Sequence, residues 1–203
     1  MQGPATHAPA GTGRPRVCNT GHVELQAGMP SLESILGLPP ALALSLVISL
    51  DGQLCGPDGS SRSISGPEDL EWLRVLRASS DAVVTGASTA AREQYKPIRV
   101  PERYAEVRKQ HGLAEHPELV ILRSSDDFDA IRATLGPRLL LEAGVRLHSA
   151  LATRIERVWL SHSPTMVGDV GAVFALPLKG FTLVARHLGD AFVVSQFERV
   201  SRH

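Results

Sequence analysis

The sequence predicts an α/β fold, with helices between the strands of a mostly parallel sheet and an antiparallel hairpin near the C-terminus. Between residues 41 and 161, short apolar runs alternate with segments of helical spacing, which is typical of parallel strands joined by helices. Two β-rich segments, 181–187 and 191–197, flank a Leu-Gly-Asp turn and predict the hairpin. A chain of 203 residues is long enough for one domain with a sizeable core.

Five apolar runs are expected to form the parallel part of the sheet. They cover residues 41–50, 81–85, 119–122, 139–141 and 155–161. Each run is short and bounded by turn or polar residues, as strands buried on both faces usually are. Helical spacing and start signals predict helices over 31–38, from Ser65 onwards, over 129–135 and over 145–151.

Two of these helix starts carry capping signals. The segment Ser65–Glu68 matches a capping box, in which the Ser65 hydroxyl accepts an amide hydrogen bond and Glu68 reaches back to the first turn. Either Ser124 or Ser125 is expected to cap the helix over 129–135. The acidic residues near that start fit the helix dipole better than they fit a metal-binding loop.

The composition argues against several classes of partner. The formal net charge is zero, so neither nucleic acid nor a membrane surface is expected to bind through bulk charge. The longest apolar run, 41–50, is too short to span a bilayer. The eight histidines show no metal-ligand spacing, and no metal is expected. Two cysteines, Cys18 and Cys55, make no disulfide framework, which suits a reducing cytoplasm.

The first 30 residues differ in composition from the rest. They contain Pro, Gly, Thr and Ala, but no basic segment followed by an apolar one, so they do not predict a secretory signal. We expect a disordered or loosely attached tail over 1–30 and a single domain over 31–203.

The stretch 138–151 predicts a ligand site. A buried strand over Leu139–Leu141 is followed by Glu142, by a tight Ala-Gly turn and by a helix that begins at Val145. Free backbone N–H groups at such a helix start bind phosphate, and ligands of open α/β sheets lie at this edge. The same residues are equally compatible with an ordinary strand-to-helix connection that binds nothing.

Four short motifs then occur in a recognisable order. They are Ser49–Gly52 (SLDG), Ile64–Pro67 (ISGP), Val83–Thr89 (VVTGAST) and Leu140–Gly144 (LLEAG). In this order, over roughly residues 41 to 200, they resemble the pyrimidine reductase family of riboflavin biosynthesis, which is the reductase half of bifunctional riboflavin proteins. The longer segment 86–112 is most similar to stand-alone members of that family.

The resemblance implies a dihydrofolate reductase-like fold of three layers and an NADPH-dependent reductase. It implies a substrate that is a phosphorylated ribosylamino-pyrimidine, whose ribose is opened and reduced to ribitol. It also implies a homodimer, for which the strand around Val158–Leu160 and the terminal hairpin are the expected apolar interface. The deaminase half of the bifunctional proteins is absent, since the sequence lacks its zinc signature.

Carried over position by position, the resemblance implies a set of NADPH-binding residues. The cofactor loop consists of Gly144, Val145, Arg146, Leu147, His148, Ser149 and Ala150. Thr89 and Glu93 also match cofactor-contacting positions. Arg123 and Ser124 follow the third strand, where such folds hold the ribose 2′-phosphate, and the planar fork of arginine suits that charge.

The resemblance implies substrate-binding residues as well. Glu142 matches a substrate-binding carboxylate, Arg77 a position near the substrate phosphate, and Arg99 is a second phosphate partner. Asp51 and Ser61 are expected to line the pocket. Each also has a plain structural interpretation: Asp51 as a turn residue, Arg77 as a solvated helix arginine and Ser61 as a loop residue. The expected catalytic residues are Glu142 and Asp51, which would order a water as the proton source.

Three departures from the family pattern bear on function. Ala143 stands where many relatives have glycine, and Val145 where proline is usual. Gln53 stands where many relatives have a lysine directly after SLDG, which leaves the exact substrate open. Two alternatives therefore remain: an NADPH-dependent reductase of another small molecule on the same fold, and a non-catalytic nucleotide-binding dimer.

Overall fold

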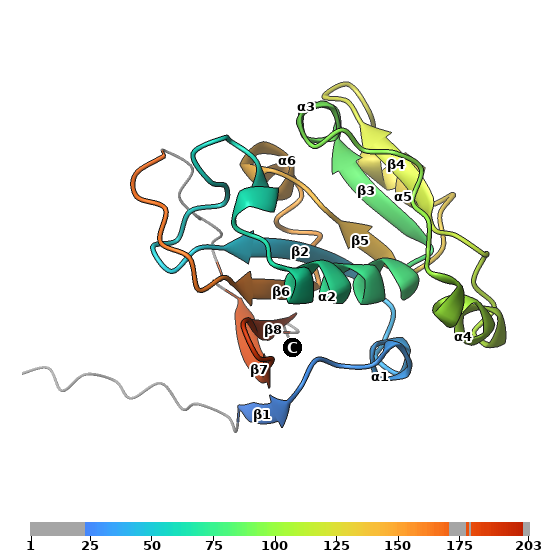
Figure 1. Cartoon of the computed structure of the whole chain (residues 1–203). Helices are drawn as coiled ribbons and strands as arrows, with labels where there is room; N and C mark the ends of the chain where they lie inside the picture. The colour runs from blue at the N-terminus through green and yellow to red at the C-terminus, as the bar shows by residue number, and fades with distance from the viewer. Residues whose placement is uncertain (1–22, 171–177, 179, 201–203) are drawn as a thin grey trace, which may run out of the picture.

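The structure is a computed structural model, which describes residues 23–170, 178 and 180–200 (Figure 1). Its centre is one eight-stranded sheet with the order β1-β7-β8-β6-β2-β5-β3-β4. The strands are β1 (Glu24–Ala27), β2 (Leu42–Ile48), β3 (Ala82–Gly86), β4 (Glu118–Leu122), β5 (Leu139–Leu141), β6 (Arg157–His162), β7 (Phe181–Leu188) and β8 (Val193–Arg199).

The strand directions confirm the predicted fold class. The neighbouring strands β6, β2, β5, β3 and β4 are all parallel, as the alternation of strands and helices predicted. The last two strands, β7 and β8, form the predicted antiparallel hairpin, and β8 also runs antiparallel to β6. The parallel half therefore brings the carboxyl ends of β2, β5, β3 and β4 to one edge of the sheet.

Short helices connect these strands. They are α1 (Leu32–Leu36), α2 (Pro67–Ala78), α3 (Ala87–Arg92), α4 (Ala105–Gln110), α5 (Phe128–Arg132) and α6 (Val145–Ala150), with 3-10 turns η1 (Ser61–Ser63) and η2 (Glu102–Tyr104). The predicted helices over 31–38, 129–135 and 145–151 correspond to α1, α5 and α6.

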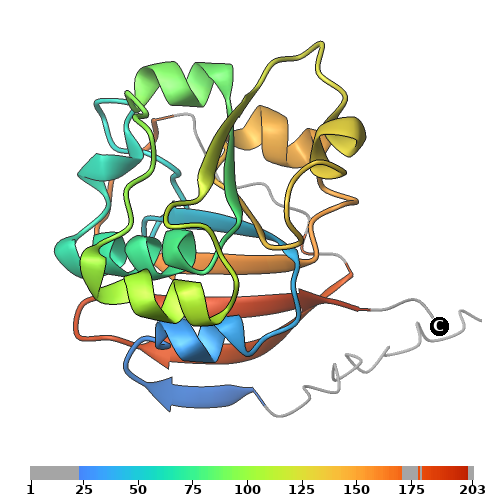
Figure 2. The same cartoon turned by 90° about the vertical axis from the view of Figure 1, so that its right-hand side faces the viewer.

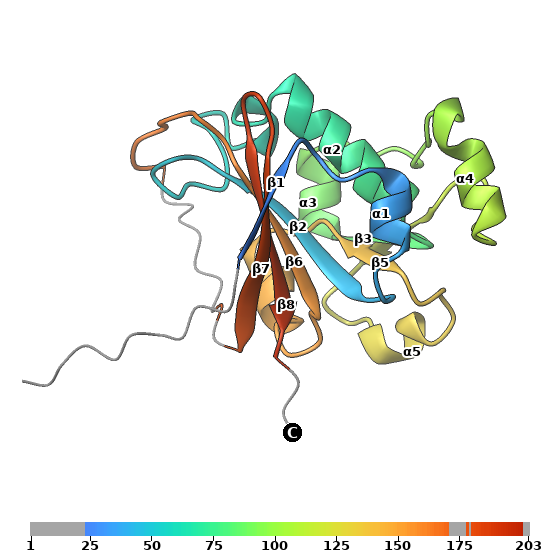
Figure 3. The same cartoon turned by 90° about the horizontal axis from the view of Figure 1, so that it is seen from below.

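Two apolar cores cover the two faces of the sheet and make three layers. On one face, Trp72 and Leu76 of α2 pack with Leu140 of β5 and with residues of α1. On the other face, Phe128 of α5 and Leu151 pack against β2, β3, β5 and β6. Figure 3 shows α1 and α2 on one side of the strands and α5 on the other.

The predicted tail over 1–30 needs a correction in its last part. Residues Glu24–Ala27 form β1, which pairs in parallel with β7 at the edge of the sheet (Figure 2). The amide of Gly28 extends this pairing with a 2.8 Å hydrogen bond to the carbonyl of Leu188. Four residues with mostly exposed side chains have no periodic pattern, so pairing with β7 decides their structure. Residues 1–22 of the predicted tail lie outside the described residues.

Two capping predictions are also wrong. Gly66 is the N-cap of α2 and makes no side-chain cap, while the Ser65 hydroxyl donates to Asp69. Glu68 instead accepts hydrogen bonds from three amides of the β7–β8 turn. At α5 the cap is Asp127, whose carboxylate accepts from the amides of the first turn, rather than Ser124 or Ser125.

Candidate active site

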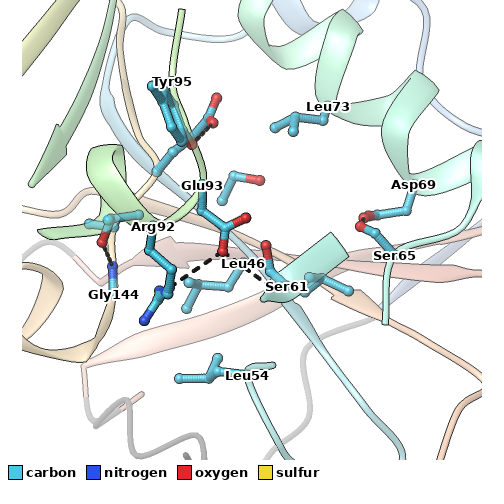
Figure 4. A pocket seen from close by; sticks show the side chains of 15 residues that line it. Leu46, Leu54, Ser61, Ser65, Asp69, Leu73, Arg92, Glu93, Tyr95 and Gly144 are labelled. Carbon is cyan, nitrogen blue, oxygen red and sulfur yellow. Dashed lines mark hydrogen bonds and ion pairs between the residues drawn. The ribbon is translucent and has the colours of Figure 1, made fainter. Parts of the chain in front are cut away.

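A cavity of about 130 Å³ opens at the carboxyl edge of the parallel strands (Figure 4). Segments far apart in the sequence form it: β2, the η1 loop, α2, α3 and the turn after β5. Its lining includes residues predicted to bind the cofactor and residues predicted to bind the substrate. These are Ser61, Thr89, Glu93, Glu142 and Gly144. The structure therefore brings the predicted cofactor turn and part of the predicted substrate site together.

The turn after β5 is held by Thr89. The amide of Gly144 donates to the Thr89 hydroxyl at 3.3 Å, and Gly144 is the residue from which α6 begins. A Cβ atom at Gly144 would lie 3.3 Å from the same hydroxyl oxygen, so a larger residue would crowd Thr89. The turn thus keeps its backbone open beside the helix start, where N–H groups are free to bind an anion.

Glu142 is the most strongly held carboxylate of the site. Its two oxygens accept a bidentate pair from Arg77, at 2.8 Å from Nε and 2.6 Å from Nη2. The Tyr95 hydroxyl donates to Oε2 at 2.5 Å, and the Arg77 guanidinium lies 5.7 Å from the centre of the Tyr95 ring. Arg77 is therefore neither a solvated helix arginine nor a free phosphate ligand here. It compensates the charge of Glu142.

These contacts shift the pKa values of Arg77 and Tyr95, the two partners of Glu142. Burial by itself lowers the pKa of Arg77, but the hydrogen bonds and charge of Glu142 outweigh it, so the pKa lies above its ordinary value. Burial, followed by the charge of Glu142, raises the pKa of the Tyr95 hydroxyl. Both groups keep their protons across the physiological range, and Tyr95 acts as a hydrogen-bond donor.

A second, strongly basic pocket adjoins the first across Tyr95. It has a volume of about 340 Å³, and four cationic side chains line it: Arg62, Arg77, Lys96 and Arg99. The two predicted phosphate partners, Arg77 and Arg99, thus line one pocket, together with two cations that the sequence did not single out. Arg77 connects the two sites, because it lines this pocket and binds Glu142.

Glu93 fastens the η1 loop to α3. Its carboxylate accepts from the Ser60 hydroxyl at 2.8 Å and from the amide of Ser61 at 3.3 Å. It also forms ion pairs with Arg62 and Arg92, with N–O distances of 3.7 and 3.6 Å. With 6% of its surface exposed, Glu93 positions the loop that carries Ser61.

Other predicted site residues lie elsewhere. The Asp51 carboxylate accepts from Ser49 at 2.6 Å and from the amides of Val167 and Gly168, which lowers its pKa, so it shapes the turn after β2. It is not among the residues that line the cavity. Its predicted catalytic role is therefore not supported by the geometry.

The helix α6 forms most of the predicted cofactor loop, and its residues differ in exposure. Val145 and Arg146 are exposed, whereas the His148 side chain is fully buried and faces the Ala143 carbonyl, with Nδ1 at 3.3 Å. Burial lowers the pKa of His148. Its side chain therefore packs inward rather than toward a cofactor. Arg123 and Ser124 are exposed just beyond the carboxyl end of β4.

Among the polar residues of the cavity that sequence reasoning did not assign to the site are Tyr95 and Asp69. Tyr95 follows Gln94, a non-glycine residue with a positive φ of 53°, and only the folded loop shows that it faces Glu142. Asp69 did carry a signal. It shares the apolar face of α2 with Trp72, Leu73 and Leu76, so its spacing predicts a buried carboxyl group.

Within the described residues, no group of three or more His, Cys, Asp or Glu side chains is arranged to hold a metal ion. In the same part of the chain, no helix has the length and apolar character needed to cross a membrane.

Comparison with known proteins supports the family resemblance. The family model of the RibD C-terminal domain matches residues 40–135. The resemblance to the pyrimidine reductases of riboflavin biosynthesis is confirmed. A search of curated protein sequences found no significant match.

Solved structures extend the fold comparison to most of the chain. A pyrimidine reductase-like protein from Corynebacterium diphtheriae is 17% identical, with a TM-score of 0.70, over 85% of this chain and 100% of that one. A dihydrofolate reductase from Enterococcus faecalis, complexed with NADP(H), is 11% identical, with a TM-score of 0.59, over 80% and 98%. At these identities the comparisons show a dihydrofolate reductase-like fold.

A bifunctional relative has the same fold over part of its length. The diaminohydroxyphosphoribosylaminopyrimidine deaminase/5-amino-6-(5-phosphoribosylamino)uracil reductase of Thermotoga maritima is 16% identical, with a TM-score of 0.58, over 79% of this chain. The match spans only 56% of the Thermotoga chain.

Proposed function

We propose that this protein is an NADPH-dependent reductase of the phosphorylated ribosylamino-pyrimidine of riboflavin biosynthesis, and that it reduces the ribosyl group to ribitol. One observation carries the proposal. Arg77 and Tyr95 join the Glu142 cavity, which contains the cofactor turn, to a pocket lined by four cations. The cofactor turn, the carboxylate and a basic pocket large enough for a phosphate follow one another in space, as such a substrate requires.

The chain has residues that fit the cofactor. The backbone at the start of α6 would bind its phosphates, Thr89 would keep the turn open, and Arg123 with Ser124 would contact the ribose 2′-phosphate at the end of β4. Gly144 leaves room for this approach, since a side chain there would crowd Thr89. When bound, the nicotinamide supplies the hydride.

The substrate would extend between the two pockets. Lys96 and Arg99 would hold its phosphate, because they are exposed at the pocket and can turn toward an anion. Arg62, which is bound to Glu93, would add its charge beside them. Glu142 would accept hydrogen bonds from the ribose hydroxyls, while Arg77 and Tyr95 keep its carboxylate in place. Placement of the reacting carbon is then the main contribution of these side chains.

Gln53 favours a second candidate, a reductase of another phosphorylated small molecule on the same fold. It stands where many relatives have lysine, and only 4% of its surface is exposed. A cationic group of the family's site is thus replaced by a neutral one, which would change the preferred carbonyl compound. For either candidate we propose the cytoplasm as the site of action, since that is where reduced pyridine nucleotide and free thiols are maintained.

NADPH oxidation with the ribosylamino-pyrimidine phosphate tests the proposal directly. We expect turnover of this substrate, and a tenfold or greater increase in KM for Arg99→Ala, because one hydrogen-bonded charge contact contributes about 1.5–3 kcal/mol. Arg74→Ala is the matched control, since Arg74 lies on the exposed side of α2 and pairs only with Glu71 in the described contacts. Turnover of other carbonyl compounds but not of the pyrimidine would favour the second candidate.

A further inference from the structure

The cavity contains a second carboxyl group, Asp69, whose surroundings differ from those of Glu142. Asp69 projects from the first turn of α2, with 6% of its surface exposed, and lines the cavity beside Ser65. Figure 4 shows Asp69 and Ser65 directed toward each other, across the cavity from Gly144. The geometry therefore places one acid near the Gly144 turn and another on the facing wall.

The partners of Asp69 are hydroxyl groups. Ser65 donates to Oδ2, and Ser161 of β6 also forms a hydrogen bond with the carboxyl group. Among the described residues, none of the ion pairs includes Asp69, whereas Glu142 has a bidentate arginine. A carboxylate that is buried without a cation is unstable, so such a group retains its proton to higher pH.

Burial raises the pKa of Asp69 above its ordinary value, and the two serine hydroxyls offset only part of this effect. The charged and titratable groups that face it across the cavity are Glu142 from the turn after β5, together with Arg92, Glu93 and Tyr95 from α3 and the loop after it. Glu93 and Glu142 each have arginine partners, so no cation in this set is left to stabilise an Asp69 anion.

We propose that Asp69 is the general acid of the reduction and donates its carboxyl proton to the substrate oxygen that gains negative charge. Two carboxyl groups whose environments differ in this way are the usual basis for separate roles in one active site. In this step the Oδ–H bond of Asp69 breaks, its electron pair stays on the carboxylate, and a new O–H bond forms on the substrate. The hydride and its electron pair come from the reduced nicotinamide. Water then returns a proton to Asp69.

This inference rests on the proposed reductase function, but its first test does not need turnover. Infrared spectra of the cofactor-free protein at pH 7 should contain the C=O band of a protonated carboxyl group that is missing in Asp69→Asn and retained in Glu71→Gln. Glu71 is the matched control, because it lies on the same helix and is partly exposed. A wild-type spectrum without this band would overturn the proposal, whatever the enzyme reduces.

Unfolding experiments give a second readout that is independent of activity. An acid whose pKa is raised in the folded protein stabilises it fully below the unfolded-state pKa, and this contribution is lost as pH rises through the folded-state value. Asp69→Asn cannot ionise. The melting temperature of Asp69→Asn minus that of wild type should therefore increase as the pH is raised from 4 to 8. The same difference for Glu71→Gln should not increase. A relative melting temperature that is constant with pH would overturn the proposal.

Kinetics complete the test. Loss of a general acid typically costs about 10²–10⁴-fold in rate, so Asp69→Asn should reduce kcat by at least a hundredfold with KM within a few-fold. Wild-type kcat should fall on the alkaline side as Asp69 loses its proton, and this limb should be absent in Asp69→Asn. An unchanged kcat, or an unchanged alkaline limb, would overturn the assignment. Absence of turnover in the wild type would instead contradict the proposed function.

Discussion

At the scale of single residues, burial separates two carboxylates that have the same kinds of partner. Glu142 and Glu71 each receive hydrogen bonds from arginine and from a tyrosine hydroxyl. The Glu142 side chain is 6% exposed, whereas that of Glu71 is 42% exposed. Water replaces lost partners easily at Glu71 but poorly at Glu142. Equivalent substitutions should therefore lower the free energy of unfolding more at Glu142 than at Glu71.

We predict that Glu142→Gln lowers reductase efficiency by roughly ten- to a hundredfold and binds NADPH within a few-fold of wild type. It should also reduce the free energy of unfolding by about 1–3 kcal/mol, since Arg77 loses a charged partner. Urea unfolding, an NADPH titration and the oxidation assay measure these effects. Glu71→Gln is the control and should change stability by less than about 1 kcal/mol. Unchanged turnover of Glu142→Gln would remove Glu142 from the mechanism.

Arg123 gives a prediction about cofactor choice. It is exposed at the end of β4, where its backbone amide is held by Asp126 at 2.8 Å, so its guanidinium extends from a fixed loop. Arg123→Ala should weaken NADPH binding about tenfold and leave NADH binding unchanged, because only NADPH has the 2′-phosphate. Fluorescence titrations with both cofactors measure this, with Arg132→Ala as the control, because Arg132 pairs with Glu156. Equal losses for both cofactors would show that Arg123 does not read the phosphate.

At the scale of elements, a carboxylate of α2 holds the C-terminal hairpin. The Glu68 side chain accepts from the amides of Asp190, Ala191 and Phe192, at 2.9, 2.8 and 3.1 Å. These amides lie at the β7–β8 turn, more than a hundred residues later in the chain. The local pattern of Ser65 and Glu68 fitted a capping box equally well, so spacing alone gave the wrong partner.

Glu68→Ala should therefore destabilise the contact between helix and hairpin. We expect a loss of about 2–3 kcal/mol in the free energy of unfolding, because hydrogen bonds to a charged acceptor are strong and three amides lose theirs. Glu71→Ala, three residues along the same helix, controls for the change in helix propensity. Hydrogen exchange at Ala191 and Phe192 should increase in Glu68→Ala alone. Similar losses in both variants would contradict this role.

The elements differ in how far the sequence predicts them. The strands β3, β5 and β6 were predicted because their apolar runs are buried almost throughout, and β2 and β4 because their runs are apolar although they are only partly buried. The edge strand β1 was not, because its side chains are mostly exposed and its hydrogen bonds depend on β7. Edge strands draw their stability from pairing rather than from a hydrophobic pattern.

At the scale of the whole molecule, the candidate site also combines features that a local sequence pattern predicts with features that depend on distant contacts. The turn around Gly144 was predictable because its motif is contiguous. The partner of Glu142 was not, since Arg77 lies 65 residues earlier and reaches it only through the packing of α2 against the sheet. Asp51 shows the reverse case. Its motif was recognised, but its carboxylate binds the amides of Val167 and Gly168, and it is not among the residues that line the cavity.

The predicted dimer interface also changes once the sheet is assembled. Val158, Trp159 and Leu160 are at most 3% exposed, so the strand that contains them cannot supply an intermolecular surface. A broad hollow at the opposite end of the strands is lined partly by charged residues of β6 and β8 and partly by apolar ones, which include Leu38, Pro39, Pro40, Ala41, Val184 and Val200. A homodimer stays a prediction, and this hollow is its candidate interface.

Substitution of Val200, which is 52% exposed, provides the test. We predict that the protein has the mass of a dimer in light scattering at micromolar concentration, and that Val200→Asp shifts it toward the monomer by placing a charge in the apolar contact. Ile121→Asp is the matched control, because Ile121 is 45% exposed on β4, at the far edge of the sheet. A monomeric wild type would contradict the dimer, while a dimer that neither variant weakens would place the interface elsewhere.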